Sequence, residues 1–162
     1  MDELIAKIRK SLEASSKHQL LESAPKVVLD MLEDEIWQTT QKYESIPDDL
    51  KSLLAVIGGE KGKDLTGWKG VLGEFRFFSP REMSLEYSNL ICHLTDASDD
   101  GSLDLDDDWF SAHYLPIGIK YSGDLLCCHL SSTKLRTHHA DGMEGFNGLT
   151  LADYLTQLFD DA

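Results

Sequence analysis

The chain has 162 residues and a formal net charge of −14, because 29 Asp and Glu outweigh 15 Lys and Arg. An apolar share of 41% and a charged share of 27% are typical of a folded globular domain and exclude a disordered acidic tail. The acidic balance also argues against binding to nucleic acid or to an anionic membrane, since both need clustered Lys and Arg. No apolar run approaches the roughly 18 residues of a membrane span, and no secretory signal opens the chain, so we expect a cytoplasmic protein.

Apolar residues at helical spacing predict two helices at the start of the chain. The first spans residues 2–14, which carry one apolar stripe. A polar break follows, and the second helix begins after Pro25, where Val28 and Met31 open a second apolar stripe.

The best delimited helix lies between Pro47 and Gly58. Proline fits a first helical turn, and Asp48 and Asp49 follow at the positive end of the helix dipole. The stretch GGEKGKD after the helix resembles a phosphate-binding loop, but Gly58 and Gly62 enclose three residues where that loop needs four. A phosphate loop also follows a strand, so we interpret these glycines as a helix stop and a turn.

The apolar period then changes to that of strands. Trp68 and VLGEFRFF predict a strand with Phe75 and Phe77 on one face, and SPRE is a capping box that opens a helix after Ser79. Beyond an acidic loop, YLPIGI, GDLLCCHL and KLRTHH predict three short strands, and Thr150 caps a closing helix. This order of elements predicts an α+β domain.

Six histidines and three cysteines raise the question of a zinc site. Cys127 and His129 share one face of a predicted strand, and His138 or His139 can lie across a hairpin from them. No C-x₂-C pair is present, however, and a structural zinc site needs four converging ligands. We therefore expect no metal here, with Cys127 and Cys128 as buried free thiols.

The acidic loop TDASDDGSLDLDDDW imitates a calcium-binding loop in part. From Asp96 to Asp104, oxygen-bearing side chains occupy loop positions 1, 3, 5 and 9, with Gly101 at position 6. Position 12 is Asp107, which is shorter than the usual bidentate Glu, and the segment that follows is interrupted by Pro116 and predicts a strand. Two requirements of a helix–loop–helix calcium site are unmet, so we expect no bound metal and no cofactor.

The same loop is the predicted partner-binding surface. So many carboxylates repel one another, and holding them together costs stability that a function can offset. Trp109 directly after them is the type of aromatic residue enriched at interface hot spots. An alternative stays open, in which Trp109 belongs to the core and the aspartates only keep a loop solvated. The predicted partner-binding residues are Asp99, Asp100, Asp104, Asp106, Asp107, Asp108 and Trp109.

No catalytic arrangement is recognisable in the sequence. It contains neither a G-x-S-x-G elbow nor an H-E-x-x-H motif, and no nucleophile, base and orienting group stand in a known pattern. We therefore expect a protein without enzymatic activity.

The order of these pieces resembles the SUKH superfamily. IPDDLKSLLAVIGGEKG looks like the opening helix and Gly-rich turn of that family, YLPIG and SGDLLCCHL after Trp109 look like its strand pair, and LADYLTQLF is similar to its terminal helix. The resemblance covers residues 25–160, although the acidic residue usual late in the Gly-Asp strand is His129 here. It implies a SUKH-like domain over residues 25–162, a twisted and mostly antiparallel sheet backed by helices, with residues 1–24 as an N-terminal helical extension.

The resemblance also implies a protein that acts by binding. Members of the family are non-enzymatic and include bacterial immunity proteins that block toxins, often nucleases or deaminases, and fungal regulators of glucan synthesis and the cell wall. The charge supports the first class independently, because an enzyme that grips nucleic acid is basic and an acidic inhibitor meets it faster. We expect an immunity protein that neutralises a basic toxin domain, with an intracellular regulatory scaffold of the fungal type as the alternative.

Overall fold

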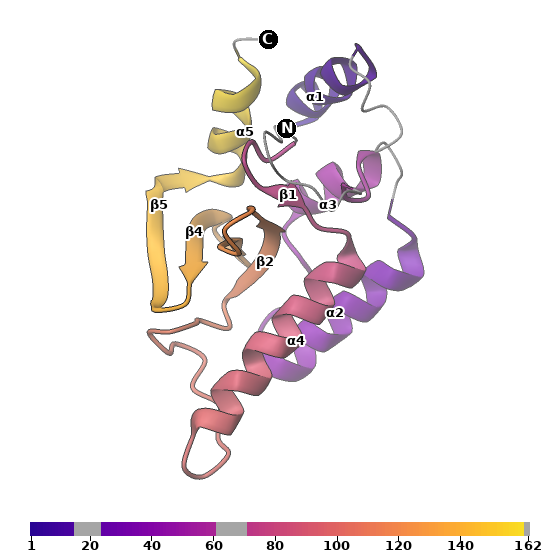
Figure 1. Cartoon of the computed structure of the whole chain (residues 1–162). Coiled ribbons are helices and arrows are strands. Elements are labelled where there is room, and N and C mark those ends of the chain that lie inside the picture. The colour runs from indigo at the N-terminus through magenta and orange to yellow at the C-terminus, as the bar shows by residue number, and fades with distance from the viewer. Residues whose placement is uncertain (15–23, 61–70, 161–162) are drawn as a thin grey trace.

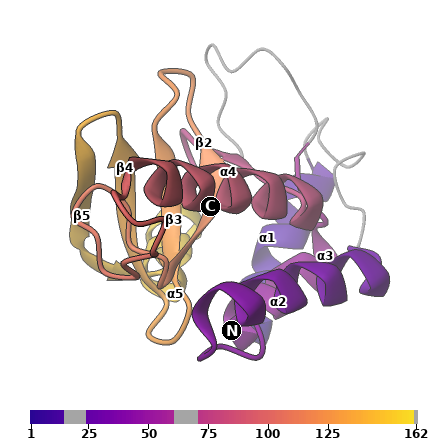
Figure 2. The same ribbon diagram turned by 90° about the horizontal axis from the view of Figure 1, so that it is seen from below.

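The computed structural model describes residues 1–14, 24–60 and 71–160, which form an α+β domain (Figure 1, Figure 2). The predicted fold class is therefore confirmed. In chain order the elements are α1 (Asp2–Ala14), α2 (Lys26–Thr40), α3 (Asp48–Val56), β1 (Arg76–Phe77), α4 (Pro80–Ala97), β2 (Tyr114–Ile119), β3 (Leu125–His129), β4 (Lys134–His139), β5 (Gly142–Thr150) and α5 (Leu151–Phe159).

The strands form one sheet in the order β1–β2–β3–β4–β5, with every neighbouring pair antiparallel. The predicted strands YLPIGI and KLRTHH coincide with β2 and β4, and LLCCH within GDLLCCHL forms β3. The long edge strand β5 was not predicted, because GMEGFNGLT holds three glycines and its only β-branched residue is Thr150. Pairing with β4, which sets His138 opposite Met143, makes this segment a strand despite its composition.

Helices α4 and α5 lie on opposite faces of β4, because neighbouring residues of a strand point to opposite sides. The His138 ring packs edge-on against Phe110, which in turn packs against Tyr87 of α4. The next residue, His139, lines a cleft together with Tyr154 of α5. Helix α2 lies beside α4, and α1 packs against α3 and α5 (Figure 1).

One hydrophobic core joins the helices to the sheet, and the N-terminal helix belongs to it. Ile8 and Leu12 of α1 are buried in this core. In α2 the predicted apolar face is partly wrong: Leu32 and Ile36 are buried, but Met31 is 66% exposed. The face that packs is therefore turned away from Met31, and the partly buried Leu29 packs against the core. None of the helices in the described part of the chain is long and apolar enough to cross a membrane.

The predicted capping box at Ser79 is present, and the predicted cap at Thr150 is also a full capping box. The Ser79 hydroxyl accepts a hydrogen bond from the Glu82 N–H at 3.2 Å, and the Glu82 carboxylate accepts one from the Ser79 N–H at 3.2 Å. Thr150 and Asp153 make the same reciprocal pair at the start of α5. Pro47 stands one position earlier than predicted, immediately before the first residue of α3.

The strand predicted over 71–78 is shortened to Arg76–Phe77. The chain turns at Gly73, where φ is 67°, and Leu72 pairs with Phe75 across that turn. Phe75 and Phe77, which were predicted to share one face of a strand, are both buried, whereas Trp68 lies outside the described residues.

A buried carboxylate fixes this region to the end of α3. Glu60 is 1% exposed, and its side chain accepts hydrogen bonds from the N–H of Val71 and, at 3.4 Å, from the N–H of Phe77. Its own N–H donates to the Phe77 carbonyl at 2.8 Å. One side chain thus joins segments that are 11 and 17 residues away along the chain.

All three cysteines are free thiols. Cys127 and Cys128 are buried, and burial raises the pKa of both, that of Cys128 to about 12. Cys92 is exposed on α4.

Candidate partner-binding site

The acidic loop begins where α4 ends, at Ala97, so Asp96 is still helical. Asp100, the second carboxylate after the helix, organises the turn around it. It accepts hydrogen bonds from the Ser102 N–H at 2.9 Å and from the Ser98 hydroxyl at 3.0 Å. Bonds from Ser102 and Ser98 hold the pKa of Asp100 at about 2, well below its usual range, because they stabilise the ionised form.

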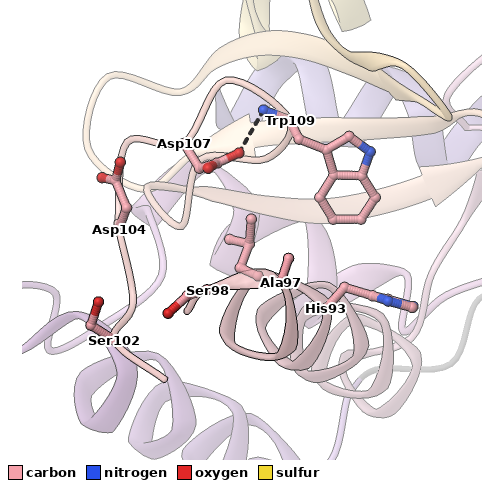
Figure 3. A pocket seen from close by; sticks show the side chains of 8 residues that line it. His93, Ala97, Ser98, Ser102, Asp104, Asp107 and Trp109 are labelled. Carbon is pink, nitrogen blue, oxygen red and sulfur yellow. Dashed lines mark hydrogen bonds between the residues drawn. The ribbon is translucent and has the colours of Figure 1, made fainter. Parts of the chain in front are cut away.

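Two further aspartates make the same kind of local turn. Asp104 accepts from the N–H of Asp106 at 3.0 Å, and Asp107 accepts from the N–H of Trp109 at 2.8 Å (Figure 3). A short carboxylate that bonds the backbone two residues on mimics a backbone turn. The aspartates of the loop therefore also help to fold it. This role was not predicted from the sequence.

Asp106 ties the loop to the segment after α2. Its carboxylate lies 3.1 Å from His113 Nε2, and the Tyr43 hydroxyl lies 2.9 Å from His113 Nδ1. An ionised carboxylate can only accept, so Nε2 carries the proton toward Asp106, and in the neutral ring Nδ1 accepts from Tyr43. The Asp106 side chain is nevertheless 79% exposed and can still meet a partner.

Trp109 lies between the two environments that the sequence left open, the core and the surface. The residue is half-buried, and its Nε1–H donates to the Ala140 carbonyl at 2.9 Å. Its ring packs edge-on against His138, with the centroids 4.7 Å apart, and against His93 of α4, with the centroids 5.9 Å apart. The indole is thus held by the fold and also forms part of the surface.

A pocket of about 350 Å³ opens between the last turns of α4 and the acidic loop (Figure 3). Three of the predicted residues, Asp104, Asp107 and Trp109, line it. The pocket residues on α4 were not predicted, because their only signal in the sequence is their helical spacing just before the loop. The complete lining is His93, Leu94, Ala97, Ser98, Ser102, Asp104, Asp107 and Trp109.

The other predicted residues, Asp99, Asp100, Asp106 and Asp108, do not line the pocket. All four are exposed and lie within the same loop. The structure therefore divides the predicted surface into a pocket and a set of exposed carboxylates outside its lining.

The pocket has the chemistry to hold a cationic side chain. Two carboxylates can pair with a guanidinium or ammonium group, while Trp109 and Leu94 can cover the aliphatic stem. An indole face also attracts a cation directly.

The candidate metal ligands are not brought together. In the residues that the structure describes, no three His, Cys, Asp or Glu side chains converge as metal ligands do. Cys127 lies opposite Arg136 in the sheet register, and His129 Nδ1 accepts from the N–H groups of Ser131 and Ser132, both at 3.1 Å. The absence of a bound metal stays a prediction for both the zinc and the calcium interpretation.

Comparison with models of protein families and with curated protein sequences found no match for this chain. The resemblance to the SUKH superfamily thus stays an expectation from short motifs.

Proposed function

We propose that the protein acts by binding and neutralises a basic protein partner, as immunity proteins of the SUKH type do. The observation that carries this proposal is the pocket at the end of α4, where Asp104 and Asp107 adjoin the ring of Trp109. A Lys or Arg side chain of the partner occupies this pocket, and the remaining aspartates of the loop steer the approach.

The hydrogen bonds of the loop support this role. Asp107 accepts from Trp109 and Asp104 from Asp106, so the carboxylates hold their positions before a partner arrives. A preformed surface loses less conformational freedom on binding, which leaves more of the contact energy as affinity.

The partner class follows from charge and from the resemblance together. A net charge of −14 complements a basic surface, and nucleases and deaminases that bind nucleic acid present such a surface. We therefore propose a basic nuclease or deaminase domain as the partner.

The test begins with the proteins encoded beside this gene, one of which should be captured by the purified chain. Stopped-flow association of that protein is then measured with Asp104, Asp106, Asp107 and Asp108 all replaced by Asn. Asn keeps the side-chain oxygen that accepts the backbone N–H bonds, so the loop should stay folded. We expect the on-rate at low salt to fall about tenfold and its salt dependence to flatten.

A matched variant separates the loop from total charge. Replacing Asp2, Glu3, Asp30 and Asp34 by their amides removes the same number of exposed carboxylates from α1 and α2. Equal slowing in both variants would mean that only total charge matters, and the loop proposal would then be wrong. A captured partner that is harmless when expressed alone would favour the regulatory scaffold.

A further inference from the structure

A second cleft, of about 670 Å³, lies on the face of the sheet opposite to the pocket. It opens between β4, β5, α5 and the turn before β1, and its lining includes Phe75, Phe146, Tyr154, His139 and Glu144. None of these residues belongs to the predicted partner surface.

Three aromatic rings line this cleft, and neighbouring rings pack edge-on at nearly right angles. Phe75 and Phe146 lie with ring centroids 6.2 Å apart and planes at 79°, and Phe146 and Tyr154 lie 5.0 Å apart with planes at 89°. The Tyr154 hydroxyl donates to the Leu72 carbonyl at 2.9 Å, which fixes its ring. Phe146 and Tyr154 are only partly buried, so a ligand can reach them. The faces of aromatic rings that line a cleft attract alkylammonium groups.

One cation of the protein itself already lies against one of these three rings. Lys120 Nζ lies 5.8 Å from the centroid of the Phe75 ring, and the Asp124 carboxylate lies 3.8 Å from the same amine. This position shows that the Phe75 wall accommodates an ammonium group, while Phe146 and Tyr154 carry no such group of the described chain.

The charged groups around the cleft carry an excess of negative charge that one more cation can balance. His139 lies between Asp124, at 3.0 Å, and Glu144, at 3.3 Å. Glu74 also lines the cleft, and its charge is among the causes that raise the pKa of Tyr154 to about 12, after burial. Even with a charged His139, the carboxylates of Asp124, Glu74 and Glu144 exceed the local cations by one.

We propose that this cleft binds a small organic cation, with its alkylammonium group against Phe146 and Tyr154 and its charge balanced by Glu144 and Glu74. The site is distinct from the pocket at α4 and does not depend on the proposed function.

The experiment uses choline as the probe and 3,3-dimethylbutan-1-ol, its neutral isostere, as the matched control ligand. Both are titrated at constant ionic strength while the aromatic NMR resonances of Phe146 and Tyr154 are followed. We expect choline to bind with a Kd of about a millimolar and the neutral alcohol to bind at least about tenfold more weakly, because the two differ only in charge.

Two variants locate the site. Glu144→Gln and Phe146→Leu should each weaken choline binding about tenfold. Asp141→Asn removes one exposed carboxylate from the turn of the same hairpin, outside the cleft lining, and should leave the Kd unchanged. The variant with four Asn in the acidic loop should bind choline as the wild type does.

Three results would overturn the proposal. The first is equal binding of choline and its neutral isostere, and the second is an equal effect of Glu144→Gln and Asp141→Asn. The third is a response confined to Trp109, which would place the cation in the pocket at α4.

Discussion

Glu60 and the aspartates of the acidic loop use the same chemistry in opposite surroundings. Each accepts backbone N–H groups, but Glu60 is 1% exposed and joins segments far apart in sequence, whereas the aspartates bond the backbone two residues on. A buried acceptor cannot be replaced by water, and an exposed one can. Carboxylates are most numerous in the exposed loop, whereas we expect the carboxylate that contributes most to stability to be the single buried Glu60.

The largest effect is expected for Glu60→Ala. The N–H groups of Val71 and Phe77 lose their acceptor inside the protein, and unpaired buried groups cost about 1–3 kcal/mol each. We therefore expect the free energy of unfolding to fall by about 3 kcal/mol in urea denaturation. Glu60→Gln keeps one acceptor oxygen and should lose less. A loss in Glu60→Ala no greater than in a surface variant would remove the contrast between the two regions.

A smaller effect is expected for Asp107→Ala, which removes the acceptor of the Trp109 N–H. Water can reach this exposed loop, so the loss should be about 1 kcal/mol. Asp108→Ala is the matched control on the neighbouring residue and should change the free energy of unfolding by less than about 0.5 kcal/mol. If the two variants are equal, Asp107 does not hold the loop.

Smaller still is the contribution of the pair between Asp106 and His113. Asp106→Asn should lower the free energy of unfolding by about 0.5 kcal/mol, because one partner of the pair is mostly exposed. Thermal melts of the variant and the wild type measure the difference, and no loss would mean that this pair does not tie the loop to the segment after α2.

The most local effect concerns the protonation of Asp100. Its folded-state pKa of about 2 lies below the unfolded value, so its stabilisation is present above about pH 4 and is lost as the pH falls through about 2. A carboxyl NMR titration should give this low midpoint, and Ser98→Ala should raise it part of the way. A midpoint near 4 in the wild type would mean that the turn at Ser102 does not form in solution.

The sequence predicted the elements whose signals are local. The capping box at Ser79, the helix cap at Thr150 and the short strand YLPIGI depend on residues a few positions apart, and all three appear in the structure. Strand β5 was not predicted, because its stability comes from pairing with β4. The structural role of Glu60 was not predicted either, because its hydrogen-bond partners follow 11 and 17 residues later.

The candidate site was predicted in part for the same reason. The aspartates and Trp109 stand out in the sequence, but the pocket also needs Leu94 and Ala97 from the helix before the loop, and nothing local marks them as residues of a site. The aromatic cleft could not be predicted, because Phe75, Phe146 and Tyr154 come from three separate elements.

The contrast between the three thiols has a practical consequence. Thiolate is the species that reacts with maleimides, so the buried Cys127 and Cys128, whose pKa values are raised, should stay unlabelled in the native protein. Cys92 is exposed and immediately precedes His93, which lines the pocket at α4. The natural sequence therefore supplies a single attachment point for a fluorophore, close enough to the pocket to report the arrival of a partner without any engineered cysteine.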